Sequence, residues 1–530
     1  MNVMRSLEAT KLDEVLAGVM RPGRYIGNEW NVVRKDPAAA DLRFALAFPD
    51  IYDIGMSYLG YRIIYGLLNQ RSDVVCERVF APWTDLEERM RALRVELFSL
   101  ESRSLIRDFD IVGFSLTYEL NYTNVLNMLD LAGIPVRRCE RGPDLPVIIA
   151  GGPAAVNPAP MAEFIDAFVI GEGEEVLLEI VDLYKKLKSE NPKLKADKDT
   201  FLRGLAHIEG VYVPAFPGVV TRRFVKDLEN SFYPVHDLVP NIQIVHDRIT
   251  LEIMRGCPYS CHFCQASAFY RPVRLRSPGK IIALARAIYA ATGYDEISLL
   301  SLSSGSYPGI AQLAEGIMAD FEGCGVGLSL SSLRSDDILK LLPSLIAKIR
   351  KTGLTFAPEA GSERLRRHIN KNIDAEKIVA ACAEAFKLGW RLVKLYFMIG
   401  LPSETAEDLQ GIVDFVRRIQ ALTKSGEISV SVNAFVPKFN TAFAAEKPDL
   451  LQSLIEKEAF LRERLRDRRI KTTFHDPWLS LLEAQFNRPD ERLAALIYGA
   501  WKNGAIFNAW GEHFNFEKWR GPLAENGISL

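Results

Sequence analysis

The feature that most constrains the fold is a repeated alternation of short apolar runs with amphipathic helical patterns. From about residue 42 the apolar runs read RFALAF, VVCERVF, DIVGFSL, PVIIAGG and DAFVIGEGEE. Short apolar runs bounded by turn residues indicate buried strands, and their alternation with helices indicates parallel βαβ units. The sequence therefore predicts an α/β fold with a doubly wound, Rossmann-type parallel sheet over residues 42–188.

A second alternating series follows further along the chain. Its apolar runs read RITLEIM, EISLLSL, VGLSLSS, GLTFAPE, RLVKLYFMIG and ISVSVNAFVP, again with helical patterns between them. Six strand–helix repeats are typical of a parallel barrel that is closed or partly open. We therefore expect a partial (β/α)6 barrel over residues 246–444.

The remaining segments differ in composition from these two series. We expect an N-terminal extension over residues 1–41 and a linker region over residues 189–245, where the charged stretch KKLKSENPKLKADKD interrupts the alternation. Beyond it, GVYVPAF and GVVTRRF are strand-like. Residues 445–530 are charged and helical in pattern, with aromatic residues toward the end, and predict a C-terminal helical domain. A chain of 530 residues is long enough for several modules.

Charge and hydropathy exclude several classes of partner. The 65 basic and 67 acidic residues nearly cancel, so no overall field favours nucleic acid or membrane. No apolar stretch is long enough to span a membrane, and the first residues carry charges where a signal peptide would be apolar. We therefore expect a cytoplasmic protein with no membrane partner.

The cysteines form one tight cluster and four scattered members. In the segment MRGCPYSCHFCQAS, Cys257, Cys261 and Cys264 have the spacing C-x3-C-x2-C directly after a strand pattern. Loops at the carboxyl ends of parallel strands are where such folds place their sites. Three thiolates can hold three irons of a cubane cluster and leave the fourth iron open for another ligand. Zinc is the alternative, but it requires a fourth ligand, and His262 is too close to Cys261 along the chain to supply it.

This loop resembles the signature of the radical S-adenosylmethionine superfamily, in which an aromatic residue such as Phe263 precedes the last cysteine. The resemblance implies a 4Fe–4S cluster whose open iron chelates S-adenosylmethionine (SAM). It also implies that reductive cleavage of SAM gives a 5′-deoxyadenosyl radical, which abstracts hydrogen from a substrate. The protein would then provide orientation and exclusion of water, while the cofactors carry the chemistry.

Further residues match the barrel of the family, which the resemblance covers from about residue 248 to 440. The resemblance implies SAM contacts after the second to fifth strands, with Glu359 near the ribose hydroxyls and the Gly400 segment flanking the adenine. A carboxylate suits the ribose role because it accepts hydrogen bonds from both hydroxyls. The full set of expected SAM-binding residues is Phe263, Ser303, Ser304, Gly305, Ser332, Arg334, Glu359, Lys394 and Gly400.

The first sheet resembles the cobalamin-binding-like domain that precedes the radical domain in part of this superfamily, including an uncharacterised bacterial family. The resemblance implies that strand-end loops hold the ligand, and the residues in question are Ser115, Thr117, Gly151, Gly152 and Gly171. The cobalt-binding pattern D-x-H-x-x-G has Tyr52 at its histidine position. Two alternatives stay open: cobalamin held without a protein histidine, or the fold retained without cobalamin.

The sequence thus predicts a radical SAM enzyme that activates a C–H bond, with cobalamin-dependent methylation as a subsidiary hypothesis. Such an enzyme needs an electron donor such as flavodoxin or ferredoxin. The substrate stays open between RNA, peptide and small molecule, because no arrangement of residues distinguishes them. The alternative is a non-catalytic iron–sulfur sensor or scaffold protein, against which the open coordination position argues.

Overall fold

The computed structural model describes residues 6–191, 197–330 and 353–530. The chain divides into two compact units, each built mainly on parallel strands. The first comprises Met1–Asp247, Ala290–Gly293 and Arg488–Ser529, and the second comprises Arg248–Tyr289, Tyr294–Asn487 and Leu530. Within the described ranges, no helix combines the length and apolar character needed to cross a membrane.

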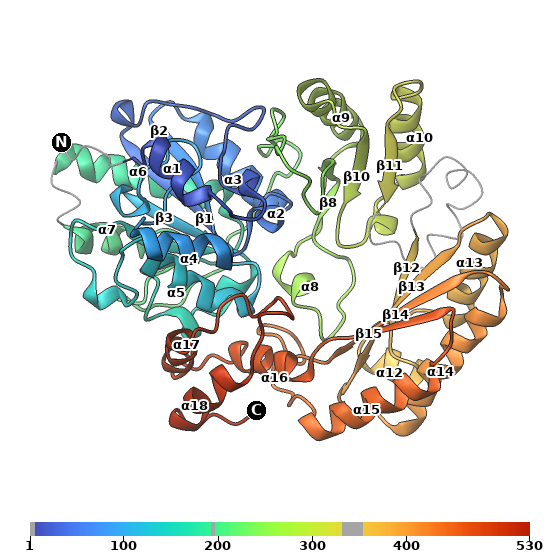
Figure 1. Ribbon diagram of the computed structural model, residues 1–530. Helices are drawn as coiled ribbons and strands as arrows, with labels where there is room; N and C mark the ends of the chain where they lie inside the picture. Colours follow the sequence, from blue (N-terminus) through green and yellow to red (C-terminus); the bar gives the residue numbers. More distant parts are fainter. Residues whose placement is uncertain (1–5, 192–196, 331–352) are drawn as a thin grey trace. The chain divides into compact units, whose positions relative to one another are not determined.

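The first unit is built on a six-stranded sheet in the order β2-β1-β3-β4-β5-β6, parallel except for β6 (Figure 1). Every residue of β2 is buried and β1 is nearly so, as expected for strands covered on both faces. The order reverses between β1 and β3, which is the switch point where such sheets bind ligands. The strand bounds are β1 (Leu42–Phe48), β2 (Val74–Phe80), β3 (Ile111–Ser115), β4 (Val147–Gly151), β5 (Ala167–Val169) and β6 (Val211–Tyr212).

Helices connect the parallel strands of this sheet. α3 packs against α6, which also contacts α7, while α5 packs against α17 from the C-terminal segment. The helices of this unit are α1 (Ala9–Leu16), α2 (Tyr52–Gly55), α3 (Leu59–Gln70), α4 (Thr84–Leu93), α5 (Tyr122–Leu131), α6 (Gly173–Glu190), α7 (Lys198–Leu205), α17 (Leu493–Lys502) and α18 (Glu517–Glu525). The predicted doubly wound parallel sheet is confirmed, and its parallel strands lie between Leu42 and Val169.

The second unit contains two parallel sheets among its described residues. The first has the order β11-β10-β7 and the second β12-β13-β14-β15. The strands are β7 (Ile249–Glu252), β10 (Glu296–Leu300), β11 (Gly327–Leu330), β12 (Leu354–Glu359), β13 (Leu392–Ile399), β14 (Glu427–Ala434) and β15 (Ile470–Phe474), with a small antiparallel pair of β8 (Met254–Arg255) and β9 (Arg274–Leu275). All six predicted strands of the barrel-like series are present.

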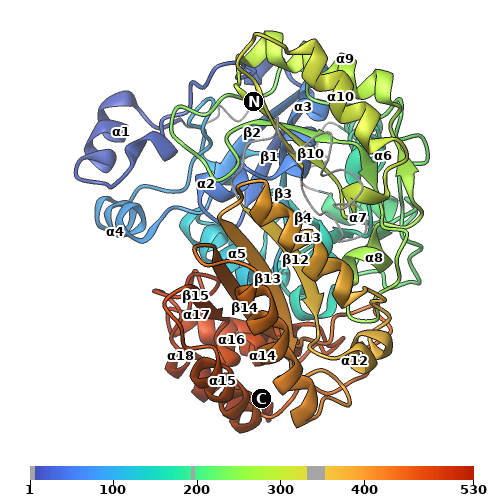
Figure 2. The same ribbon diagram turned by 90° about the vertical axis from the view of Figure 1, so that its right-hand side faces the viewer.

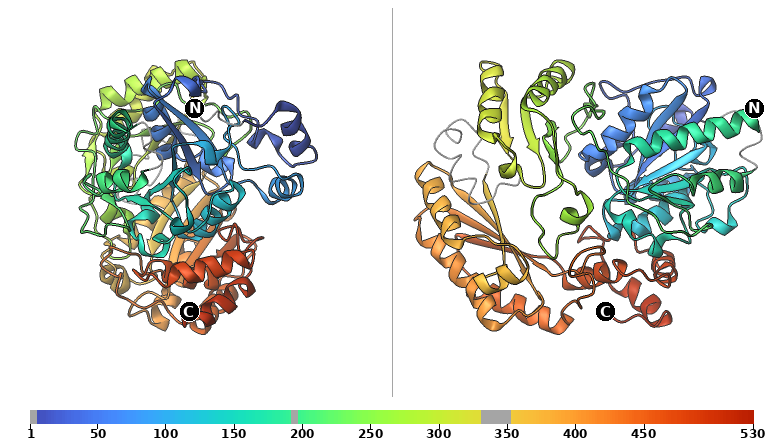
Figure 3. Two further views of the ribbon diagram at one scale, coloured as in Figure 1. Left: turned by 90° about the vertical axis from the view of Figure 1, so that its left-hand side faces the viewer. Right: turned by 180° about the vertical axis from the view of Figure 1, so that it is seen from behind.

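Helices cover one face of each of these sheets. α9 and α10 lie side by side (Figure 2), and α13, α14 and α15 line the same face of the four-stranded sheet (Figure 3). In β13, Val393, Leu395 and Phe397 are buried in that core, whereas Tyr396 is 39% exposed on the other face. The helices are α8 (Gln265–Phe269), α9 (Pro278–Thr292), α10 (Ile310–Asp320), α12 (Glu363–His368), α13 (Ala375–Lys387), α14 (Ala406–Ala421), α15 (Leu451–Arg464) and α16 (Pro477–Phe486).

The structure differs from the sequence prediction in the C-terminal region. Residues 445–530 do not form a unit of their own, because α15 and α16 belong to the second unit while α17 and α18 belong to the first. The charged run after α15 is not wholly helical either, since β15 pairs in parallel with β14. The strand-like GVVTRRF forms no strand and makes a single bridge, from Arg223 to Gly171.

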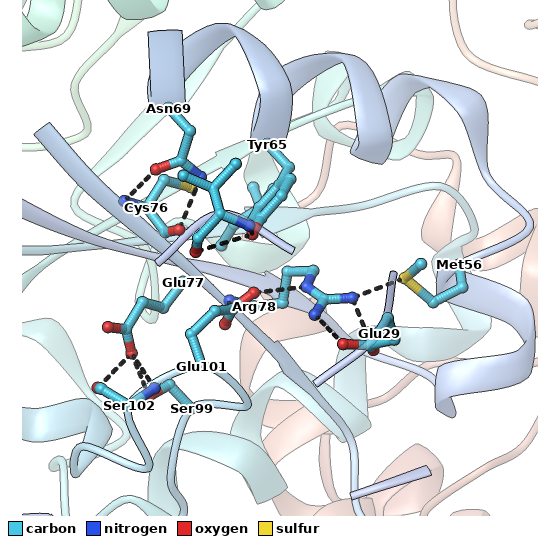
Figure 4. Close-up of polar contacts among 12 residues, drawn as sticks. Glu29, Met56, Tyr65, Asn69, Cys76, Glu77, Arg78, Ser99, Glu101 and Ser102 are labelled. Carbon is cyan, nitrogen blue, oxygen red and sulfur yellow. Dashed lines mark hydrogen bonds and ion pairs between the residues drawn. The ribbon is translucent and has the colours of Figure 1, made fainter. Parts of the chain in front are cut away.

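The interior of the first unit holds a network of buried charges around Arg78 (Figure 4). The guanidinium is fully buried and forms ion pairs with Glu29 at 2.7 Å and Glu101 at 2.6 Å. The Cζ atom of Arg78 lies 5.2 Å from the centre of the Tyr65 ring. Burial raises the pKa of Glu101, and Arg78 offsets this only in part. For Glu29, burial is outweighed by the charge and hydrogen bonds of Arg78, so the pKa of that carboxyl is lowered.

Candidate functional site

The cysteine loop connects β8, the first strand of the small antiparallel pair, to the short helix α8 in the second unit. Gly256 begins the loop with a φ of +93°, a left-handed conformation that favours glycine. A Cβ atom at this position would lie 2.7 Å from the carbonyl oxygen of Tyr270 and 2.8 Å from that of Pro272. Gly256 therefore allows the loop to pass directly against the strand that returns at β9.

The three cysteines are half-buried, and none forms a disulfide bond. Cys264 caps the N-terminus of α8, where its sulfur accepts a hydrogen bond from the Ser267 amide at 3.4 Å. Among the residues that the structure describes, no three His, Cys, Asp or Glu side chains converge as a metal site. The donor set still suits an iron–sulfur cluster by its chemistry, because three thiols lie within eight residues of one accessible loop.

The serine-rich loop after β10 lies against the cysteine loop. Ser303 and Ser304 are buried, and their hydroxyls bond to those of Ser306 at 2.9 Å and Ser301 at 3.0 Å. The hydroxyl of Ser306 lies 3.4 Å from that of Tyr259, within the cysteine loop. The structure thus brings the predicted Ser303-Ser304-Gly305 segment to the cysteine loop.

Glu359 ends β12 in an unusual backbone conformation. Its φ is +66°, and the register with β13 shifts between Phe356 and Glu359. A left-handed non-glycine residue at a strand irregularity costs about 1–3 kcal/mol and is typical of functional sites. The carboxylate forms an ion pair with Lys371 at 2.5 Å, and both side chains are only 14% exposed. Lys371 Nζ lies 5.9 Å from the centre of the Phe263 ring, so the predicted residues Glu359 and Phe263 share one neighbour.

Gly400 lies beyond the end of β13, where its segment packs against α15. A Cβ on Gly400 would lie 3.0 Å from both Asp449 and Leu454, and its amide donates to Glu404 at 2.7 Å. Burial raises the pKa of Glu404, although Lys457 binds that carboxylate at 2.6 Å and opposes the shift. These contacts give the Gly400–Glu404 turn a packing role.

The structure gives less support to Lys394, Ser332 and Arg334 as SAM-binding residues. Lys394 is the third residue of β13, so it lies in the body of the strand and away from the carboxyl end. Ser332 and Arg334 lie outside the described residues.

Comparison with known proteins assigns this loop to a family. A model described as "Radical SAM superfamily" matches residues 251–416, which include the three cysteines and Glu359. A second, "Radical SAM proteins, N-terminal", matches residues 60–214. The chain belongs to the radical SAM superfamily of enzymes. This confirms the resemblance drawn from the cysteine spacing.

One relative matches nearly the whole chain. An uncharacterized protein of Methanocaldococcus jannaschii is 27% identical over 488 residues, 91% of this chain and 97% of that one. An uncharacterized methyltransferase of Pyrococcus horikoshii is 26% identical over 263 residues, 48% of this chain and 53% of that one. Among solved structures, the cobalamin-dependent SAM radical enzyme OxsB, with aqua-cobalamin bound, gives a TM-score of 0.54 at 14% identity over 92% of this chain and 71% of that one. The last match shows a shared fold.

The predicted cobalamin residues of this radical SAM protein lie at the strand ends of the first unit. Ser115 and Thr117, at and just beyond the end of β3, are half-buried. Gly151 ends β4, and Gly152 has a φ of +109°, where a Cβ would lie 2.5 Å from the Leu116 carbonyl oxygen. A Cβ on Gly171 would lie 2.0 Å from the Arg223 carbonyl oxygen. Gly152 and Gly171 are therefore glycines because the chain's own backbone packs against them.

Tyr52 stands where the cobalt-binding pattern has histidine, and it is turned into the core. Its hydroxyl donates to Glu29 at 2.9 Å, and the side chain is buried. It therefore cannot ligate a metal at the strand ends.

Several contacts near these sites were not predicted from the sequence. At the switch point, Trp510 of the C-terminal segment donates its indole N–H to Asp50 at 3.0 Å, and His513 stacks edge-on against Trp83 with ring centres 4.6 Å apart. Burial raises the pKa of Asp50. In the second unit, Asn370 and Lys371 contact the cysteine loop. A polar NKN run after a helix was the only local signal for the latter pair.

Proposed function

We propose that Cys257, Cys261 and Cys264 hold a 4Fe–4S cluster whose open iron binds SAM. When bound, the cluster supplies the electron that cleaves SAM to methionine and a 5′-deoxyadenosyl radical, which activates a C–H bond of the substrate. The observation that supports this most is the three-cysteine loop, which lies inside the segment matching the superfamily model and carries no disulfide. The remaining residues of the site then bind and orient SAM.

The proposed roles of the surrounding residues follow from their chemistry. Glu359 accepts hydrogen bonds from the ribose hydroxyls, and its fixed left-handed backbone presents the carboxylate at the strand end. The buried hydroxyls of Ser303 and Ser304, with Gly305, would bind the amino group of SAM. Phe263 provides an apolar surface beside the cluster. Ser332, Arg334, Lys394 and Gly400 are retained as proposed SAM contacts on the basis of the motif alone.

The proposed reaction sets requirements outside the site. We propose that a low-potential donor such as flavodoxin or ferredoxin supplies the electron, because the superfamily commonly needs a reductant. The same chemistry favours a cytoplasmic location, where protein thiols stay reduced. The substrate class stays open between RNA, peptide and small molecule.

A second candidate function is cobalamin-dependent methylation. The observation that favours it is the fold shared with OxsB, a cobalamin-dependent enzyme, over 92% of this chain. Ser115 and Thr117 offer half-buried hydroxyls at the end of β3 and would contact the cofactor, together with Gly151. The closed contacts at Gly152 and Gly171 leave those two glycines to the chain's own backbone. Cobalamin in this unit would be held without a ligand from the Tyr52 loop.

Anaerobic reconstitution tests the first proposal. Wild type and the single Cys257→Ala, Cys261→Ala and Cys264→Ala variants would be loaded with iron and sulfide, with Cys324→Ala as the matched control because Cys324 is exposed and distant in sequence. Loss of the 4Fe–4S spectrum in the three variants only, and a changed electron paramagnetic resonance spectrum when SAM is added to reduced wild type, are expected. A reduced cluster whose spectrum does not change when SAM is added would instead favour the sensor or scaffold alternative.

Binding of hydroxocobalamin tests the second proposal separately. Equilibrium dialysis followed by the visible spectrum would measure retention by wild type and by a Ser115→Ala, Thr117→Ala double variant. Retention by wild type that weakens in the double variant supports the cobalamin proposal. No retention by wild type would leave the radical reaction without cobalamin.

A further inference from the structure

Three consecutive residues after α12 each contact the cysteine loop. The first, Ile369, is fully buried in an apolar cluster with Leu365, Leu401 and Phe443, against which Phe263 packs. Its carbonyl oxygen accepts a hydrogen bond from the His262 amide at 3.0 Å. The segment is thus anchored in the core on one side and bound to the cysteine loop on the other.

Asn370 binds the cysteine loop at Ser260. Its side-chain amide donates to the Ser260 carbonyl oxygen at 2.8 Å and lies 3.0 Å from the Ser260 hydroxyl. The backbone of Asn370 has a φ of +54°, a left-handed conformation that asparagine tolerates better than most residues. This conformation turns the chain between Ile369 and Lys371.

Lys371 contacts the cysteine loop at Phe263 and places a positive charge beside it. Its ammonium pairs with Glu359 at 2.5 Å and lies 5.9 Å from the centre of the Phe263 ring, directly before Cys264. Because both partners of the ion pair are only 14% exposed, solvent screens this charge less than it would a surface lysine. The contacts of the three residues therefore follow the loop from Ser260 to Phe263, the stretch that contains Cys261 and precedes Cys264.

We propose that Ile369, Asn370 and Lys371 form a clamp that positions the cysteine loop before the cluster is built, and that Lys371 makes the bound cluster easier to reduce. The second part rests on the proposed function. A cluster held by three thiolates is anionic and gains a further negative charge on reduction, and nearby charge helps to set its potential. The three are positioning residues, since they act through the loop.

The clamp is tested first in the protein without a cluster. Site-resolved alkylation under anaerobic conditions would compare Cys261 and Cys264 in wild type, Asn370→Gly, Lys371→Met and Lys371→Arg. Glycine removes the amide without straining the left-handed backbone. Lys387→Met is the matched control, because Lys387 is 73% exposed on α13 and pairs only with Glu384 among described residues.

Asn370→Gly should raise the alkylation rates about fivefold, the effect of losing one hydrogen bond. Lys371→Met should raise them about two- to fivefold, the effect of losing a cation–π contact. Lys387→Met should leave them unchanged. Rates in Asn370→Gly and Lys371→Met equal to wild type, with thermal unfolding also unchanged, would overturn the clamp. This result needs neither cluster nor SAM, so it stands apart from the fate of the proposed function.

Lys371 is then tested in the reconstituted protein. The midpoint potential, from a redox titration followed by electron paramagnetic resonance, should fall in Lys371→Met and return toward wild type in Lys371→Arg, which keeps the charge. A merely structural lysine would change the amount of cluster and leave the potential of the remaining cluster unaltered. Equal potentials in wild type, Lys371→Met and Lys387→Met would overturn this part of the proposal.

Discussion

The two units treat the carboxyl ends of their parallel strands in opposite ways. In the first unit, backbone carbonyls approach the place of a Cβ at Gly152 and Gly171 to 2.5 and 2.0 Å, and Trp510 binds Asp50 at the switch point. In the second unit, the corresponding positions carry half-buried cysteines and the left-handed Glu359. At Gly152 and Gly171 the first unit packs its own backbone against the strand ends, although Ser115 and Thr117 stay half-buried there. The second unit instead carries three thiols and a carboxylate.

The charged groups of the two units also differ in how far they are buried. Arg78 is fully buried between Glu29 and Glu101, whereas Lys371 and Glu359 keep some access to solvent at a strand end. Buried ion pairs of the first kind matter for stability once formed, because removing one partner leaves the other charges buried without a counter-charge. Strained, partly exposed groups of the second kind are typical of sites that act on a ligand. If the proposed function holds, the radical reaction takes place on the second unit, and the buried ion pairs of the first unit contribute to its stability.

The largest expected effect is on the stability of the first unit. Arg78→Leu should lower the free energy of unfolding by about 3–5 kcal/mol, because Glu29 and Glu101 would stay buried without their cation. Chemical denaturation would measure this, with Arg286→Leu as the control, since among the described residues Arg286 pairs only with Asp320, at the surface. A loss no greater than that of the control would contradict the stabilising role of the network.

Two glycine substitutions should separate the units directly. Gly171→Ala should destabilise the first unit by about 1–3 kcal/mol from backbone strain alone, since its φ is +127°, and leave the cluster spectrum intact. Gly256→Ala should reduce cluster content severalfold, because its Cβ meets the carbonyl oxygens of Tyr270 and Pro272. Iron content and thermal unfolding measured together would check both. The comparison fails if Gly171→Ala also abolishes the cluster in folded protein.

Glu359→Gln should weaken SAM binding about tenfold while leaving the cluster in place. A charged acceptor contributes about 1.5–3 kcal/mol to a hydrogen bond, and the amide also loses the ion pair with Lys371. Isothermal titration of the oxidised, cluster-loaded protein with SAM would measure the affinity. Glu363→Gln, on the neighbouring exposed turn, is the matched control. Unchanged affinity would remove Glu359 from the proposed ribose contact.

The smallest expected effect is a pH-dependent loss of stability at the N-terminal cap of α14 in the second unit. Burial alone would raise the pKa of Asp408, but hydrogen bonds from Ser362, Thr405 and Arg364 outweigh it and lower the pKa below its usual 3.8. The carboxylate therefore stabilises the fold fully above about pH 4, and this contribution is lost as the pH falls through the lowered pKa.

Asp408→Asn should cost about 1 kcal/mol at pH 7, the usual effect of an N-terminal cap. The difference from wild type should shrink as the pH drops below about 4. Denaturation curves at several pH values would show this, and Asp414→Asn on the exposed face of α14 would serve as control. A difference that is independent of pH would rule out the carboxylate as its source.

Much of the fold was predictable because continuous apolar runs determine buried parallel strands. Strand β15 was missed, because only Ile470 of its five residues is buried and the segment follows a run of arginines. The placement of α17 and α18 was also hidden, since it depends on contacts such as that between Trp501 and Asn127, 374 residues apart. Periodicity reports a buried face and does not identify its partner.

The candidate site was predictable where spacing alone defines the chemistry. The three cysteines could be identified because a C-x3-C-x2-C loop after a strand suits one kind of cluster. Glu359 followed from its place after a strand, but its left-handed backbone could not be foreseen. Asn370 and Lys371 escaped notice because an ordinary polar turn in sequence becomes a clamp only when tertiary folding brings it to Ser260 and Phe263.

The most direct test of the central claim is the formation of 5′-deoxyadenosine. Wild type and Cys261→Ala would be reconstituted anaerobically, reduced with dithionite and incubated with SAM, and the nucleoside would be measured by chromatography. The account predicts 5′-deoxyadenosine from wild type and none above background from Cys261→Ala. An intact, reduced wild-type cluster that neither binds nor cleaves SAM would contradict it.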